Sequence, residues 1–278
     1  MSKKLSIGYS PCPNDTYIFY GLAHRKIMQP EPVFDQPLLE DVETLNRWAM
    51  EKKLDVTKLS FHALGHVLDE YCVLSAGSAL GRGCGPLLVA GPGFDAKELA
   101  AAKVAIPGKY TTANMLFRMF SQRSTNLVEM RFDTIMEAVI AGNVDAGVII
   151  HESRFTYAEQ GLICLQDLGQ WWEETSGLPI PLGCIAARRS LGRDTIAAIE
   201  GAIAESIACA DADPGKCLPY MQEHAQEMNT NVMESHIGLY VNEYSRNLGD
   251  EGLAAIDAFL ERGRKAGIIP ESSQRVLF

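Results

Sequence analysis

One stretch constrains the fold of this chain more than any other. Residues 146–150 form a short apolar run, and the polar sequence His-Glu-Ser-Arg follows it directly, beginning at His151. An apolar run of this length is typical of a buried strand. The segment before it, residues 138–143, has the spacing of a short helix, and Gly142 suits the helix C-terminus. A helix followed at once by a buried strand predicts an α/β unit.

His151 then stands at the carboxyl end of a strand, where ligands bind in open α/β sheets. An imidazole with the usual pKa of about 6.5 is largely neutral near pH 7 and can accept a proton. The spacing also allows a structural role, in which His151 merely ends the strand and bonds a neighbouring loop. Glu152 is expected on the opposite side of an extended chain, so it is not expected to orient His151.

Composition and charge narrow the functional class. The 278 residues are 47% apolar and 22% charged, which is typical of a soluble globular protein with two lobes. A formal charge of −10 argues against nucleic acid and anionic lipid as partners. Pro11 and Pro13 interrupt the only apolar segment near the N-terminus, and no run of 18 apolar residues exists, so we expect a cytoplasmic location.

The cysteines indicate neither a disulfide framework nor a metal site. Their number is odd, and no pair has Cys-x-x-Cys spacing. We therefore expect reduced, mostly buried thiols and no bound metal. The seven cysteines are residues 12, 72, 84, 164, 184, 209 and 217.

Two proline-containing loops follow predicted strands and precede predicted helices. In the first, between a strand at residues 5–9 and a helix at residues 16–27, Asn14 or Asp15 can cap the helix or contact a ligand. In the second, Thr111 and Thr112 precede a helix and can act as a plain cap or as an anion site, because unpaired amides and hydroxyls point the same way there.

Two further segments suggest ligand contacts. In the strand expected at residues 54–61, alternation puts Lys58 and Ser60 on one face and Leu59 on the other, although Lys58 also suits an exposed edge position. Trp171 and Trp172 can wall an aromatic ligand, while core packing is the commoner use of tryptophan.

The order of elements predicts a discontinuous larger domain, residues 1–90 and 187–278, with a smaller domain inserted at residues 91–186. The chain is expected to cross between them at residues 87–90 and 182–187. Other strands are expected at residues 33–39, 72–80, 103–106, 127–132 and 162–165, and other helices at residues 40–50, 62–71, 96–102, 113–120, 134–142, 193–210, 215–226, 230–248 and 251–266.

Six segments together resemble the 1,4-dihydroxy-6-naphthoate synthase family of the futalosine pathway of menaquinone biosynthesis. The resemblance extends over nearly the whole chain and is weakest in its helical C-terminal third. The segments are Ser-Pro-Cys-Pro-Asn-Asp-Thr (10–16), Glu-Asp-Val-Glu-Thr-Leu-Asn-Arg-Trp (40–48), Thr-Lys-Leu-Ser (57–60), Ala-Leu-Gly-Arg-Gly-x-Gly-Pro-Leu (79–87), Thr-Thr-Ala (111–113) and Ile-Ile-His-Glu-Ser-Arg-Phe-Thr-Tyr (149–157).

The resemblance implies a two-lobed α/β fold of the type 2 periplasmic-binding-protein kind, working without a metal or organic cofactor. It implies conversion of cyclic dehypoxanthinyl futalosine, an anionic aromatic carboxylate, to 1,4-dihydroxy-6-naphthoate and dihydroxyacetone. His151 matches the family's proton acceptor. The substrate-binding positions it implies are Lys58, Leu59, Ser60, Thr111 and Thr112, to which the loop analysis adds Asn14.

Two other functions remain open from the sequence. A binding protein of the same architecture captures a ligand without changing it. Chorismate dehydratase shares the fold but is expected to lack the His-Glu-Ser-Arg-Phe run. In any of these cases the two lobes are expected to close on the ligand, and a homodimer is possible.

Overall fold

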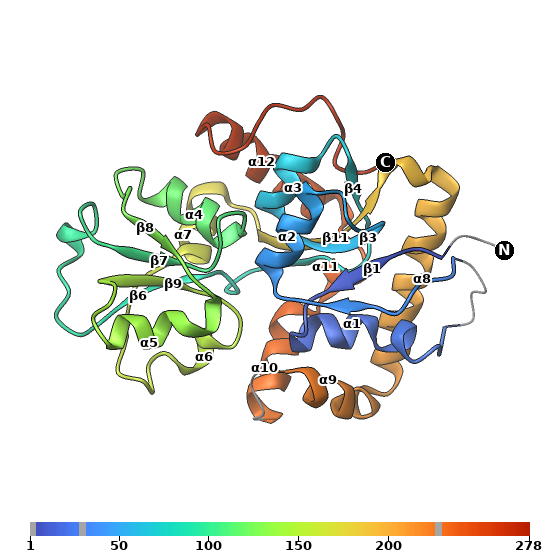
Figure 1. Ribbon diagram of the computed structural model, residues 1–278, viewed down its shortest axis with the longest axis horizontal. Coiled ribbons are helices and arrows are strands. Elements are labelled where there is room, and N and C mark those ends of the chain that lie inside the picture. Colours follow the sequence, from blue (N-terminus) through green and yellow to red (C-terminus); the bar gives the residue numbers. More distant parts are fainter. Residues whose placement is uncertain (1–3, 28–31, 226–229) are drawn as a thin grey trace.

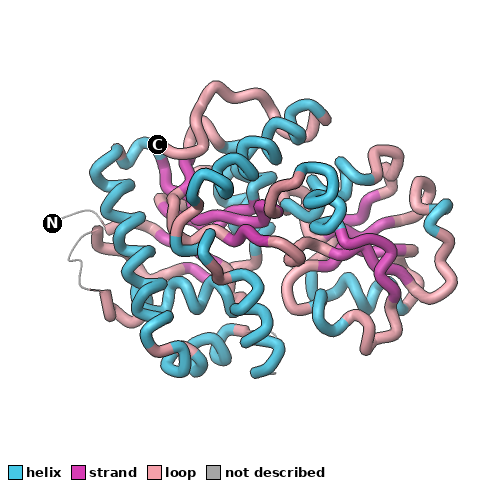
Figure 2. The backbone as a smooth tube through the Cα atoms, turned by 180° about the vertical axis from the view of Figure 1, so that it is seen from behind, coloured by secondary structure: helices cyan, strands magenta, loops and turns pink. Residues whose placement is uncertain are grey.

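The computed structural model describes residues 4–27, 32–225 and 230–278. The basic start of the chain before Lys4 and the expected helix end at Gln226 lie outside the described residues. The polypeptide forms two lobes, each with a central sheet flanked by helices (Figure 1, Figure 2). Among the described residues, none of the helices combines the length and apolar character needed to span a membrane.

The first lobe contains a mixed sheet in the order β2-β1-β3-β11-β4, with β5 also paired to β11. Its N-terminal strands are parallel, and the long strand β11 runs antiparallel to its three partners. The strand expected at residues 33–39 is reduced to the two residues of β2, and Phe34 forms only an isolated bridge with Leu5. The strands are β1 (Ile7–Tyr9), β2 (Leu38–Leu39), β3 (Val56–Ser60), β4 (Tyr71–Val73), β5 (Ala79–Gly81) and β11 (Ile180–Arg188).

The second lobe contains a five-stranded sheet in the order β10-β6-β9-β7-β8. Strand β9 is parallel to β7 and antiparallel to β6. It is buried along its whole length, as its apolar sequence predicted, and it leads directly to His151. The strands are β6 (Leu87–Ala90), β7 (Val104–Ile106), β8 (Leu127–Glu129), β9 (Ala146–Ile149) and β10 (Ile163–Asp167).

The helices cover both faces of the first sheet and part of the second. Helix α1 packs most closely on α8, while α2, α3 and α12 lie on the opposite side of the first sheet (Figure 1). The helices of the first lobe are α1 (Pro13–Ala23), α2 (Val42–Met50), α3 (Phe61–Val67), α8 (Arg193–Ala212), α9 (Leu218–His224), α10 (Thr230–Tyr240), α11 (Glu243–Arg246) and α12 (Gly249–Lys265). Those of the second are α4 (Thr112–Phe120), α5 (Ile135–Ile140), α6 (Ser153–Thr156) and α7 (Leu168–Ser176).

Two chain segments connect the lobes (Figure 1). All of β6 pairs within the second sheet, and β11 pairs throughout with strands of the first. The division at residues 90/91 and 186/187 stays a prediction. The pairing of the strands instead favours crossings at residues 82–86 and 177–179. The first of these segments lies between β5 of the first sheet and β6 of the second, and the other lies just before β11 of the first sheet.

Local hydrogen bonds explain two differences from the predicted helices. Residues 96–102 form only a short 3-10 turn, Ala96–Glu98, in place of a helix. The helix expected at residues 230–248 is interrupted after Tyr240, where the Asn242 side chain accepts from the Tyr244 amide and Ser245 bonds back to the Asn242 amide. This capping box starts a new helix and so ends the previous one.

Candidate active site

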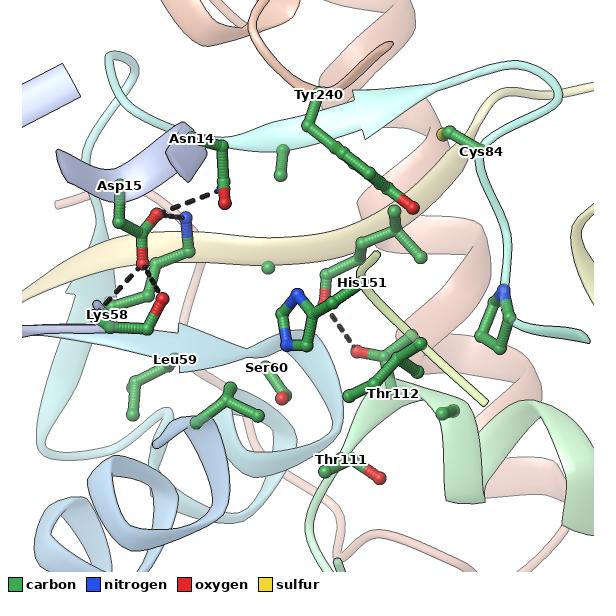
Figure 3. A pocket seen from close by; sticks show the side chains of 18 of the residues that line it. Asn14, Asp15, Lys58, Leu59, Ser60, Cys84, Thr111, Thr112, His151 and Tyr240 are labelled. Atoms are coloured by element: carbon green, nitrogen blue, oxygen red, sulfur yellow. Dashed lines mark hydrogen bonds and ion pairs between the residues drawn. The ribbon is translucent and has the colours of Figure 1, made fainter. Parts of the chain in front are cut away.

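A pocket between the lobes is lined by His151 and by all six residues that the sequence analysis named as substrate-binding positions (Figure 3). Its empty space, counted with the open solvent at its mouth, is about 680 Å³. Both lobes supply its walls. The seven selected residues in its lining are Asn14, Lys58, Leu59, Ser60, Thr111, Thr112 and His151.

The first loop delivers polar groups to the pocket, but not as helix caps. Cys12 occupies the cap position of α1 without a side-chain hydrogen bond, so the capping role considered for Asn14 and Asp15 is wrong. The Asp15 carboxylate instead accepts from the Ser10 amide at 3.1 Å and the Ser10 hydroxyl at 2.8 Å. Asn14 donates its Nδ2 to Asp15 at 3.1 Å.

Lys58 is buried and forms an ion pair with Asp15, which excludes the exposed edge position (Figure 3). Its ammonium is thus already neutralised inside the protein. Breaking such a pair leaves one buried charge uncompensated, which is costly. Ser60, two residues along β3, accepts from the Asn46 side chain at 3.1 Å and keeps its own hydroxyl proton at the pocket wall.

The second loop forms the helix N-terminus that its threonines predicted. Thr111 caps α4 by accepting from the Asn114 amide at 3.3 Å. Its hydroxyl donates to the Gly108 carbonyl, and that of Thr112 donates to the Leu182 carbonyl at 2.6 Å. Both hydroxyl protons are therefore committed to the backbone. The first amides of the helix, at Thr112 and Ala113, have no partner within the helix and remain as donors at the pocket wall.

His151 has a backbone conformation that sequence spacing did not predict. Its φ of 57° lies in the left-handed region, which is uncommon for a residue other than glycine. The chain therefore turns at His151, and the expectation that Glu152 points away from it is wrong. A ring nitrogen of His151, a carboxylate oxygen of Glu152 and the Cys12 sulfur all lie within 4.8 Å of one another.

The surroundings of His151 favour a neutral imidazole. Its ring meets Phe132 edge-on at 5.0 Å between centroids and lies nearly parallel to His236 at 6.1 Å. Burial lowers the pKa of His151 below its usual value, and the nearby carboxylates of Glu152 and Asp15 oppose that change. A neutral imidazole in a pocket has the lone pair that a general base needs.

Two pocket residues from α10, His236 and Tyr240, escaped the sequence analysis. Because Asn14 directs its Nδ2 to a carboxylate, its Oδ1 must accept from His236, whose Nε2 lies 3.0 Å away. The proton of His236 therefore resides on Nε2. Burial lowers the pKa of His236 far below its usual value and keeps it neutral. No motif in the helical C-terminal third signalled either residue.

Cys12, His151 and Glu152 are the group in the described part of the chain whose side chains could supply three metal ligands. The 4.8 Å limit on their separations is looser than the roughly 3.5 Å between neighbouring ligand atoms of tetrahedral zinc. The arrangement therefore does not by itself form a metal centre.

Polar contacts also join the lobes beside the pocket. The Glu43 carboxylate of α2 accepts from the Tyr110 amide at 3.0 Å, and His62 of α3 bonds the Thr111 carbonyl at 3.0 Å. Burial lowers the pKa of His62 to about 3, so the ring is neutral and its Nδ1–H donates. Gly108 has a φ of 144°, and a Cβ there would lie 2.6 Å from Glu43. Close approach of the two lobes therefore requires glycine at this position.

The tryptophan pair does not line this pocket. Trp172 is fully buried against Phe259, and its indole donates to the Pro179 carbonyl at 3.0 Å. Trp171 packs edge-on against Phe120. Core packing, the alternative considered for this pair, is the one observed.

Similar structures define the fold family. A crystal structure of a protein from Archaeoglobus fulgidus superimposes with a TM-score of 0.90 at 36% identity, covering 96% of this chain and 98% of that one. The periplasmic aliphatic sulphonate binding protein of Escherichia coli superimposes with a TM-score of 0.66 at 12% identity, covering 99% and 91%. The chain thus has the two-lobed fold of periplasmic binding proteins.

Sequence relatives define the family more narrowly. The 1,4-dihydroxy-6-naphthoate synthase of Thermus thermophilus is 48% identical over 96% of this chain and 97% of its own length. That of Streptomyces coelicolor is 45% identical over 96% and 95%. The model of a family described as menaquinone biosynthesis matches residues 5–265. Because the family model matches nearly the whole chain and both relatives are more than 40% identical in sequence, the protein belongs to the menaquinone biosynthesis family.

Proposed function

We propose that this protein is a carbon–carbon lyase that converts cyclic dehypoxanthinyl futalosine to 1,4-dihydroxy-6-naphthoate and dihydroxyacetone. The observation that carries the proposal is the position of His151, a neutral imidazole in a pocket whose other polar groups come from both lobes. The names of the relatives from Thermus and Streptomyces, 1,4-dihydroxy-6-naphthoate synthase, support the naphthoate product of this reaction.

The substrate carboxylate would bind at the N-terminus of α4. The amides of Thr112 and Ala113 and the hydroxyl of Ser60 are the donors available there, and the helix dipole favours an anion. Lys58 is a weaker candidate because Asp15 already neutralises it. A protein with a formal charge of −10 must hold an anion with such local groups.

The aromatic part of the substrate would lie on the apolar wall of the same pocket. Leu59, Ile150, Leu182 and Tyr240 contribute this surface. Burial of flat apolar area supplies affinity, while the few polar groups fix the orientation. Tyr240 enters from α10, so the first lobe also contributes a contact from its C-terminal helices.

In the reaction, His151 would remove a proton from the furanose portion of the substrate. Collapse of that portion releases the three-carbon product, and aromatisation of the remaining bicycle drives the reaction. General-base catalysis contributes typically about 10²–10⁴-fold, and fixed orientation adds several kcal/mol. We propose that the chain's own residues suffice for this chemistry without a cofactor, in the cytoplasm.

An assay with two substrates tests this function against its alternatives. Purified protein is incubated separately with cyclic dehypoxanthinyl futalosine and with chorismate, and naphthoate absorbance and dihydroxyacetone are measured. Naphthoate and dihydroxyacetone in equal amounts, from the first substrate alone, are the expected result. Turnover of chorismate would indicate a dehydratase, and binding without turnover of either compound would indicate a binding protein.

A further inference from the structure

Glu152 has an unusual environment for a carboxylate. The residue is only 7% exposed, and its carboxylate lines a cavity and forms no hydrogen bond or ion pair with another residue of the described part of the chain. Buried carboxylates are normally paired, since an uncompensated charge is expensive to bury. A carboxylate in this largely buried position without an ionic partner points to a role that the resting protein does not display.

The neighbour that Glu152 does approach is His151. With the left-handed backbone of His151, a carboxylate oxygen of Glu152 lies within 4.8 Å of a ring nitrogen. The two groups form no hydrogen bond, but they are close enough for a charge interaction. Strained backbone of this kind concentrates at functional sites. An extended backbone at this position would place the two side chains on opposite sides.

The two residues share one cavity, but only His151 also lines the substrate pocket. His151 lines both the substrate pocket and a second, neighbouring cavity, whereas Glu152 lines only the second one. An unpaired carboxylate in the substrate pocket would repel an anionic substrate, whereas the Asp15 carboxylate there is paired with Lys58. Behind the imidazole, it can act on the base without contacting the ligand.

We infer that Glu152 is a positioning residue that stabilises the positively charged imidazolium formed when His151 takes a proton from the substrate. The inference rests on the proposed function. In that step the substrate C–H bond breaks, its electron pair stays with the substrate, and the proton joins the free nitrogen of His151. The imidazole becomes a cation, and the Glu152 carboxylate then has the ionic partner that it lacks in the resting state.

The other ionisable groups around His151 are less able to fill this role. Asp15 is paired with Lys58, and Asp41 accepts two amides as the cap of α2. Cys12 has a thiol whose pKa burial raises, so it is neutral, as is His236. Lys58 opposes a positive charge on His151, whereas Glu152, whose carboxylate lies within 4.8 Å of the ring, favours one.

Direct titration of His151 by NMR tests the inference without relying on turnover. Glu152→Gln keeps the size of the side chain and removes its charge, so the pKa of His151 should fall. Glu152→Asp should restore part of the shift, and Glu159→Gln, at an exposed position in the following turn, should leave the pKa unchanged. If Glu152→Gln does not fold, Glu152→Met supplies the neutral variant.

Kinetics provide the second readout. We expect kcat of Glu152→Gln to fall about tenfold or more, the acid limb of its pH profile to move to lower pH, and KM to stay within about twofold. An unchanged His151 pKa in the neutral variant overturns the inference, as does a loss confined to KM. If the pKa of His151 shifts in Glu152→Gln but the wild-type protein has no lyase activity, the charge interaction is supported and the proposed function is rejected.

Discussion

Replacing Glu43 with glutamine should stabilise the protein at neutral and alkaline pH but not at acidic pH. Glu43 lies at the contact between the lobes with its side chain 8% exposed. Burial raises its pKa from the ordinary 4.5 to about 7, although bonds from Tyr110 and Asn46 oppose the change. Arg47 Nε lies 3.3 Å from Oε1 without hydrogen-bond geometry, which leaves that oxygen without a hydrogen bond among the described residues.

The magnitude follows from the pKa. Because the folded pKa exceeds the unfolded one, the protonated carboxyl favours folding. This contribution is complete below pH 4.5 and is lost as pH rises through about 7. A change from 4.5 to about 7 corresponds to about 3 kcal/mol at most. Glutamine is neutral throughout and retains the oxygen that accepts from Tyr110. The variant and wild type should therefore be equally stable near pH 4.5 and differ by about 2–3 kcal/mol at pH 8.

Thermal unfolding at several pH values measures the difference. For a chain of this size about 2–3 kcal/mol corresponds to roughly 5–10 °C in Tm. Glu129→Gln is the matched control, because Glu129 also pairs with Arg47 but is 39% exposed, and surface ion pairs contribute little. An equal shift in Tm at pH 5 and pH 8, or a Glu43→Gln variant less stable than wild type at pH 8, would refute the reasoning.

Three further predictions concern the pocket. Lys58→Met should lower the free energy of unfolding, measured by urea denaturation, by about 3–5 kcal/mol, because it leaves Asp15 unpaired. Adding Asp15→Asn should recover part of this loss, and additive losses in the double variant would contradict the pairing. Replacing Thr111 and Thr112 with valine should raise KM at least as clearly as it lowers kcat, because it disturbs the helix terminus that would hold the substrate carboxylate. An unchanged KM would mean that the carboxylate binds elsewhere. Product binding should reduce the radius of gyration in small-angle scattering, because groups of both lobes line the pocket; identical curves at saturation would indicate a preformed cleft.

The sequence predicted the elements that depend on local pattern. Strand β9 is an apolar run between two polar segments, and α4 begins at a threonine cap, so both follow from spacing and capping rules. These elements place His151 and Thr111, and the structure brings both into one pocket with Lys58. Their roles in catalysis and binding remain proposals.

The parts that the sequence did not predict depend on backbone torsions or on contacts distant in the chain. The left-handed conformation of His151 reverses the expected direction of Glu152, and no residue type signals it. His236 reaches the pocket by packing of α10 against α1, and its tautomer depends on Asn14, more than two hundred residues earlier. The partner of Lys58 likewise becomes visible only when β3 and α1 are side by side.

The central claim is that His151 transfers a proton, and single-turnover kinetics of His151→Gln test it most directly. Calorimetric binding of the naphthoate product provides the parallel measure of affinity. If His151 acts as the base, the rate of the chemical step should fall at least about 100-fold while product affinity changes only a few-fold. A variant that retains more than about a tenth of the wild-type rate, or that loses affinity in proportion to rate, would contradict the assignment of His151 as the general base.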